Sequence, residues 1–183
     1  ALAELSFKVF PLPAARLTLQ LPTEGAEAAA RVFTEAAGAR WECEALDLLP
    51  DGQTVCLRLA GPAPAIEAVS REILARWPGQ ALAPDRAEAL WAEVREFRWA
   101  HADGVLAKVA LTPAAMPALD AAVRSLKGAR IHFSVGGNLA FVSLPPAVAL
   151  TALPERPRAL GLAGPTLRGG APLWPGRNPI PAI

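Results

Sequence analysis

Few side chains in this sequence are of the types that perform chemistry, and they are scattered. Lys108 interrupts an apolar, strand-like run, where a lysine either extends its amine to solvent or meets an anion. His132 is predicted in another strand, opposite Phe141 and with no carboxylate expected beside it, which favours a structural histidine over a catalytic base. An anionic ligand would be favoured by Lys108, Arg58 and His132 together.

The sequence contains none of the motifs that mark a self-sufficient site. Its two histidines, His101 and His132, are far apart in the predicted topology, and no Cys/His spacing suits zinc, so we expect no metal site. Neither Gly136-Gly137 nor Gly169-Gly170 is followed by a helix that cradles a phosphate, and no G-x-G-x-x-G, Walker or G-x-S-x-G pattern occurs. Any cofactor site would need another piece of protein.

The two cysteines are predicted to be free thiols in a reducing compartment. A hairpin closed at residues 50–53 places Cys43 opposite Ala60 and Cys56 opposite Asp47. Four residues of ladder, roughly 13 Å, then separate the two thiols, which is too far for a disulfide.

The length and the net charge of the chain limit the classes of function that it could have. A chain of 183 residues can form one domain with an apolar core. The formal net charge is +1, which provides no electrostatic footprint for nucleic acid or an anionic membrane. No apolar run has the roughly 18–20 residues that span a bilayer. We therefore expect a soluble, cytoplasmic protein.

Two stretches repeat the same order of elements. The first, residues 15–78, has a strand at 16–21, a helix at 23–37, a hairpin across Asp51-Gly52 and a second helix. The second, residues 104–163, has a strand at 105–111, a helix at 112–127 and a hairpin across Gly136-Gly137. We therefore predict an α+β fold in which duplicated ferredoxin-like (βαββα) units form one large antiparallel sheet with helices on one face.

The remaining segments flank or join these repeats. A helix at 85–98 links them, a last strand covers 166–168, residues 1–13 form a connecting strand, and 171–183 form an extended tail. Residues 14–170 make up the domain that contains both repeats.

The hairpin registers divide the strand residues between the two faces of the sheet. The core face is predicted to hold Leu46, Leu48, Val55, Leu57, Leu59, Ile131, Phe133, Val135, Ala140, Val142 and Leu144. The opposite face, called the second face below, is predicted to hold Arg16, Thr18, Gln20, Trp41, Cys43, Cys56, Arg58, Lys108, His132, Ser134 and Phe141. This face is either an ordinary solvated surface with stray aromatics or one that packs on another domain or subunit and contributes polar groups to a site between them.

Several segments resemble a known family. The strand Glu4–Pro13, the run Val105–Pro113 with its basic residue Lys108, the glycine-containing hairpin Val135–Phe141, and Thr166–Gly170 with Leu173–Arg177 are similar to the C-terminal half of the FAD-binding subunit of bacterial glycolate oxidase. That subunit is one of the flavoproteins with a two-part FAD-binding domain and a cap domain. The family's cap is a large antiparallel sheet flanked by helices, and its free face looks toward the flavin.

The resemblance implies a function and its residues. The chain would be the cap domain of a flavin-dependent glycolate oxidase subunit, which oxidises the 2-hydroxy acid glycolate to glyoxylate with FAD. Lys108, Arg58 and His132 would bind the substrate. Arg168 and Arg177 would belong to the cofactor site, in contact with the flavin domain or with partner subunits. The partners would be a second flavin subunit and an iron–sulfur subunit, in a complex that is cytoplasmic or peripheral to the inner face of the membrane.

Two further expectations accompany this one. The glycine-rich domain that holds most FAD contacts in the family is absent from this sequence, so we expect a fragment or truncated subunit that is inactive alone. The alternative is a non-catalytic domain with a duplicated ferredoxin-like fold that binds a protein or small ligand with the same second face.

Overall fold

The computed structural model describes residues 12–39, 41–148 and 164–170. These residues form an eight-stranded antiparallel sheet with strand order β4-β1-β3-β2-β6-β7-β5-β8. The strands are β1 (Ala15–Pro22), β2 (Cys43–Leu48), β3 (Thr54–Gly61), β4 (Gln80–Ala81), β5 (Val105–Ala110), β6 (Arg130–Ser134), β7 (Leu139–Leu144) and β8 (Thr166–Arg168). The predicted α+β class and single antiparallel sheet are confirmed.

Four α-helices accompany the sheet. They are α1 (Ala26–Gly38), α2 (Ala63–Arg76), α3 (Pro84–Arg95) and α4 (Met116–Arg124), and two short 3₁₀ turns, η1 (Pro113–Ala115) and η2 (Val135–Gly137), complete the elements. Proline lies in the first turn of α2, α3 and α4, where its missing N–H leaves no helical hydrogen bond unmade. Helix α1 begins at Ala26, three residues after the predicted start.

The strand order shows an internal twofold relationship. Reading inward from the edges, β4-β1-β3-β2 of the first repeat corresponds to β8-β5-β7-β6 of the second. Each set is the strand order of a ferredoxin-like unit. The fourth strand of the second set, β8, is the last strand predicted at 166–168, whereas β4 of the first set was not predicted. The two units therefore join through their β2 and β6 edges to make one sheet.

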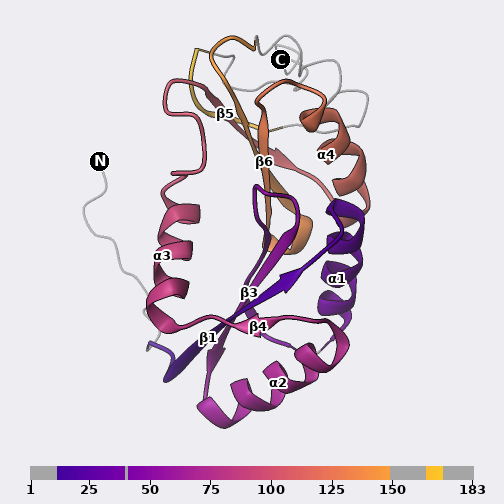
Figure 1. The fold of residues 1–183 in the computed structure, drawn as a ribbon, viewed down its shortest axis with the longest axis vertical. Helices are drawn as coiled ribbons and strands as arrows, with labels where there is room; N and C mark the ends of the chain where they lie inside the picture. The colour runs from indigo at the N-terminus through magenta and orange to yellow at the C-terminus, as the bar shows by residue number, and fades with distance from the viewer. Residues whose placement is uncertain (1–11, 40, 149–163, 171–183) are drawn as a thin grey trace, which may run out of the picture.

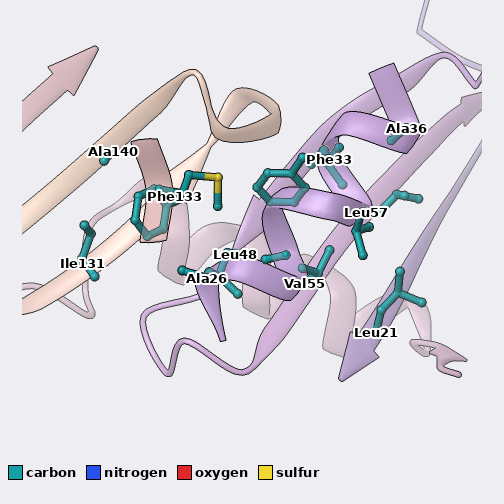
Figure 2. Packing of buried hydrophobic residues seen from close by; sticks show 14 of the residues in the cluster. Leu21, Ala26, Phe33, Ala36, Leu48, Val55, Leu57, Ile131, Phe133 and Ala140 are labelled. Atoms are coloured by element: carbon teal, nitrogen blue, oxygen red, sulfur yellow. The ribbon is translucent and has the colours of Figure 1, made fainter. Parts of the chain in front are cut away.

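One bridge pair joins the two units within the sheet. Leu48 of β2 lies opposite Phe133 of β6, and both side chains are fully buried. The core cluster continues across this junction from Leu57 on one side to Ile131 on the other, as Figure 2 shows. Helix α1 also contacts α4 and η2, so packing of the helices reinforces the short strand pairing.

Helix α3 lies on the face of the sheet opposite α1 and α4 (Figure 1). Trp91 of α3 donates its indole N–H to Thr18 Oγ1 at 2.9 Å, and Thr18 alternates along β1 with the core residue Leu19. The expectation of helices on one face therefore holds for α1 and α4 but is wrong for the linking helix. Burial of Trp91 is the reason, because its large apolar ring is removed from water only against the second face.

A β-bulge in β2 corrects two predicted positions. Cys43 lies opposite Leu59 instead of Ala60, and Ala45 lies opposite Arg58, so Glu44 is an extra residue in the ladder. The bulge reverses the in-out alternation of every residue before it. Trp41 is accordingly buried in the core cluster and not on the predicted second face, and Cys43 packs against the same cluster.

Val135 is the other residue predicted on the wrong side. Strand β6 ends at Ser134, and Val135 takes a left-handed φ of 54° that leaves its side chain 58% exposed. Gly136 and Gly137 continue the turn at φ 60° and 81°. Gly137 must be glycine for two reasons. Its φ of 81° is left-handed, and a Cβ there would lie 2.5 Å from Met116 Sδ.

Candidate functional site

The bulge in β2 aims the Glu44 carboxylate at two guanidinium groups. Arg16 of β1 donates from Nε and Nη2 to Glu44 at 3.0 and 3.1 Å, which is a bidentate arrangement. Arg58 of β3 brings its Nε within 2.7 Å of Glu44 Oε2 as an ion pair. The inserted residue thus places one carboxylate between two arginines, and bulges commonly re-aim a side chain in this way.

The contact between Glu44 and Arg16 shifts the pKa of both groups. The hydrogen bond from Arg16, followed by the charge of Arg58, lowers the pKa of Glu44 below its ordinary value. The same hydrogen bond raises the pKa of Arg16. All three groups are therefore ionised at neutral pH, and together they carry one positive charge in excess.

Arg58 is further held by an aromatic ring. Its Cζ lies 4.9 Å from the centroid of the Trp91 indole, which is a cation–π contact across the second face. The buried Nε of Arg58 has no aligned hydrogen-bond acceptor among the described residues, although Glu44 lies near it. Arg58 is thus positioned on two sides while one donor is left without a well-directed acceptor.

A second polar cluster joins the repeats at the centre of the sheet. Asp47 of β2 accepts a hydrogen bond from Ser134 Oγ at 2.8 Å, and its other oxygen lies 3.0 Å from His132 Nε2. Because a carboxylate only accepts, we place the imidazole proton on Nε2. Asp47 and His132 are 4% and 1% exposed, so the pair is sealed from solvent.

Aromatic side chains seal His132. The ring centroids of Trp99 and His132 are 5.7 Å apart in an edge-on arrangement, and Phe141 stacks on the imidazole at 6.0 Å. Phe97 in turn contacts Phe141. The chain between α3 and β5 therefore covers this part of the second face, and the interpretation of that face as an ordinary solvated surface is wrong here.

An open cleft of about 500 Å³ lies beside the junction of the two repeats, between residues of β2 and η2. Its polar lining comes from Glu44, Asp47, Arg58, Arg95, Ser134 and Asn138, and its apolar lining includes Phe33, Trp41, Trp91, Val94 and Val135. Both repeats and α3 contribute to it. A cleft of this size between structural units, with a few polar groups on apolar walls, is typical of small-molecule sites.

The structure separates the predicted substrate residues. Arg58 lines the cleft, whereas buried His132 reaches it only through its hydrogen-bond partner Asp47. Lys108 is half-buried on β5, opposite Phe141 on the second face as predicted, and its backbone N–H donates to Pro165. Lys108 is not part of the cleft lining.

The predicted flavin-domain contacts lie elsewhere. Arg168 is exposed at the edge strand β8, where its Nη2 donates to the His101 carbonyl at 2.9 Å. Arg177 lies outside the described residues, as do residues 1–11 of the predicted connecting strand, the end of the second repeat at 149–163, and the tail 171–183.

Sequence analysis missed Glu44 and Asp47. Asp47 occupies a position expected to be unremarkable on the second face. Glu44 lies where the apolar residues change phase, from Trp41 and Cys43 to Leu46 and Leu48, and this change of phase was the available indication of a bulge.

The cysteines are free, as predicted. Cys56 is fully buried beside Asp47, and burial, followed by the charges of Asp47 and Asp51, raises the pKa of its thiol to about 12. Burial also raises the pKa of Cys43. Neither thiol has the lowered pKa of a reactive nucleophile.

Within the described residues no group of three or more His, Cys, Asp or Glu side chains is arranged to hold a metal ion. None of the helices in that part of the chain has the length and apolar character needed to cross a bilayer.

Comparison with known proteins does not identify the chain. No protein-family model matches it, and no curated protein matches it.

Proposed function

We propose that this chain is the cap part of a flavin-dependent glycolate oxidase subunit, where its sheet closes over the flavin and substrate. The observation that carries the proposal is the architecture, one antiparallel sheet built from two ferredoxin-like units with flanking helices. The resemblance of Val105–Pro113 and Val135–Phe141 to family segments implies this architecture. The first segment contains β5, and the second contains the turn η2 and the start of β7.

The described residues do not themselves fit FAD. The glycine pair Gly136-Gly137 is packed against side chains of this chain, with Met116 and Phe33 beside Gly137 and Leu46 beside Gly136. Arg168 already donates to a backbone carbonyl. Under the proposal another domain therefore holds the flavin, and this chain binds and encloses the substrate without supplying the redox chemistry.

Lys108 is the first candidate for the substrate carboxylate. It lies on the second face and is partly buried. Charge-assisted hydrogen bonds from an amine to a carboxylate contribute about 1.5–3 kcal/mol. In the proposed complex, with a second flavin subunit and an iron–sulfur subunit, Lys108 would orient glycolate beneath the flavin.

The experiment uses the complete protein that contains this sequence, purified with its partner subunits. Glycolate added without oxygen is expected to bleach the flavin absorbance. Lys108→Met should raise the KM for glycolate about tenfold or more, as the loss of one charged hydrogen bond implies. Lys127→Met, at an exposed loop position, is the matched control and should leave KM unchanged. Two results would contradict the proposal. One is a complete protein without flavin absorbance, and the other is flavin absorbance that glycolate does not bleach.

One observation favours the alternative of a non-catalytic binding domain. Trp91, Trp99 and Phe97 from this chain already cover much of the second face, so less of it is open to a flavin domain than the family's cap implies. The cleft between the repeats is open. A complete protein without flavin that still binds a small ligand would support this alternative.

A further inference from the structure

In the cleft between the two repeats, two arginines bind a carboxylate of the chain itself, that of Glu44. Glu44 is held by Arg16 at 3.0 Å and by Arg58 at 2.7 Å, and Glu44 and Arg58 both line the cleft. The contacts show that two guanidinium groups at this position can hold a carboxylate in a bidentate manner. The position of that carboxylate depends on the β-bulge, since Glu44 is the inserted residue.

The two arginines offer more hydrogen-bond donors than the one carboxylate beside them can accept. Glu44 faces Arg16 and Arg58, while the nearby carboxylate of Asp47 accepts from Ser134 and His132 and keeps its negative charge. Arg58 Nε lies 2.7 Å from Glu44 Oε2, although its N–H is not aligned with that oxygen. A ligand carboxylate in the place of Glu44 would meet the same guanidinium donors.

The walls beside this site are apolar and aromatic. Trp91 lies on Arg58, and Val94 follows Trp91 by one turn of α3. The exposed Val135 stands at the rim in a left-handed conformation, which is strained for a β-branched residue, and such strain is concentrated at functional sites. A ligand with a charged end and an apolar body fits this combination.

We propose that the cleft is a binding site for a small organic monocarboxylate, which Arg58 and Arg16 bind when Glu44 moves aside. Glu44 is thus an internal competitor that neutralises the arginines while the site is empty of ligand. The proposal goes beyond the proposed function, which places the substrate carboxylate at Lys108, and it rests on the contacts of Glu44 and not on the presence of a flavin.

Competition between Glu44 and a ligand carboxylate for the two arginines leads to an expectation that can be measured. A tethered group acts at an effective concentration on the order of millimolar or more, so Glu44 weakens the binding of an external carboxylate. Removing its charge should therefore increase affinity, whereas removing an arginine should decrease it. A site in which Glu44 serves only to stabilise the fold would show no gain in affinity on its neutralisation.

The test uses the full 183-residue chain, with calorimetric titration of sodium benzoate and, separately, sodium glycolate against sodium chloride as the simple-anion reference. Glu44→Gln should bind benzoate about tenfold more tightly than the unsubstituted chain, a gain of about 1.4 kcal/mol. Arg58→Met should abolish binding. The control is Glu27→Gln, which removes the carboxylate of an exposed ion pair between Glu27 and Arg31, 3.0 Å apart on α1. This variant should leave the affinity unchanged.

Thermal unfolding followed by circular dichroism establishes that each variant is folded. Should Arg58→Met not fold, Arg16→Met takes its place, since Arg16 is exposed and its replacement should still weaken benzoate binding several-fold. Equal affinity of Glu44→Gln and the unsubstituted chain would overturn the inference. The inference would also be overturned if Glu44→Gln increased the affinity for chloride as much as for benzoate, because that result would show a nonspecific anion effect.

The two proposals fail separately in these experiments. Benzoate binding that responds to Glu44→Gln supports the carboxylate site even where glycolate does not bleach the flavin of the complete protein. If glycolate bleaches the flavin but Glu44→Gln does not change the benzoate affinity, the oxidase function is supported and this site is refuted.

Discussion

Asp47 and His132 belong to different repeats, stand 85 residues apart in the sequence, and meet with Oδ2 and Nε2 at 3.0 Å in the middle of the sheet. They lie next to Leu48–Phe133, the bridge pair that joins the two repeats within the sheet. A polar contact therefore reinforces the sheet where its backbone pairing is shortest.

Replacing Asp47 by Asn tests the contribution of this contact. The amide keeps the size of the side chain but cannot accept from both Ser134 and His132 as a carboxylate does. We expect Asp47→Asn to lower the free energy of unfolding by about 2 kcal/mol, the range for hydrogen bonds to a buried charge. Urea denaturation measures this loss.

The matched control neutralises a surface ion pair of the same kind. Glu72 and Arg76 pair at 2.8 Å on α2 with half of each side chain exposed. Glu72→Gln should change the free energy of unfolding by about 0.5 kcal/mol or less. Comparable losses for the two variants would show that Asp47 has no special role at the junction.

Gly137 and Gly25 form a second matched pair. Both have positive φ, at 81° and 96°, so both are strained by alanine. A Cβ at Gly137 would lie 2.5 Å from Met116 Sδ and 3.0 Å from Phe33, whereas a Cβ at Gly25 would contact nothing within 4 Å. Gly137→Ala should therefore be the more destabilising by about 1–3 kcal/mol, the range for overpacking.

Thermal or urea unfolding of the two alanine variants gives the difference directly. Equal destabilisation would mean that Met116 and Phe33 move aside at no cost, and that the helix α1 and turn η2 are more loosely packed than the contacts indicate.

The cysteines provide a chemical test of burial. Cys56 is fully buried with a thiol pKa raised to about 12, so its reactive thiolate is scarce in the folded chain. A Cys43→Ser variant should not react with Ellman's reagent at mildly alkaline pH and should release one equivalent per chain once urea unfolds it. Rapid reaction of the folded variant would contradict the described packing of β3.

Much of the fold was predictable because strand alternation and helix periodicity act locally. Leu57 and Ile131 were assigned to the core from register alone, and both are fully buried. The bulge at Glu44 was missed because one register was extended through the whole strand, although the apolar residues change phase across it, from Trp41 and Cys43 to Leu46 and Leu48. Periodicity also shows which side of α3 is buried but not which face of the sheet it covers.

The candidate site was less predictable than the fold for a related reason. Arg58 was identified from its charge on the second face, but its partners Glu44 and Trp91 come from a bulge and from the linking helix. The pairing of Asp47 with His132 depends on how the two repeats dock, which no local pattern specifies.

The pH dependence of stability tests the Glu44 site itself. The pKa of Glu44 is lowered in the folded state, chiefly by the Arg16 hydrogen bond, so its stabilising contribution is present above the pKa of the unfolded chain. That contribution is lost as the pH falls through the lower folded pKa. The unsubstituted chain should thus exceed Glu44→Gln in stability at neutral pH by about 1 kcal/mol or less, given the exposure of the pair.

Urea denaturation of both chains across the acidic range measures this gap. We expect it to close as Glu44 is protonated, because the protonated carboxyl and the glutamine amide then interact alike with the arginines. A gap that persists or widens at acidic pH would show that the effect of the substitution arises from packing and not from the ion pair. Such a result would also remove the charge competition on which the proposed carboxylate site depends.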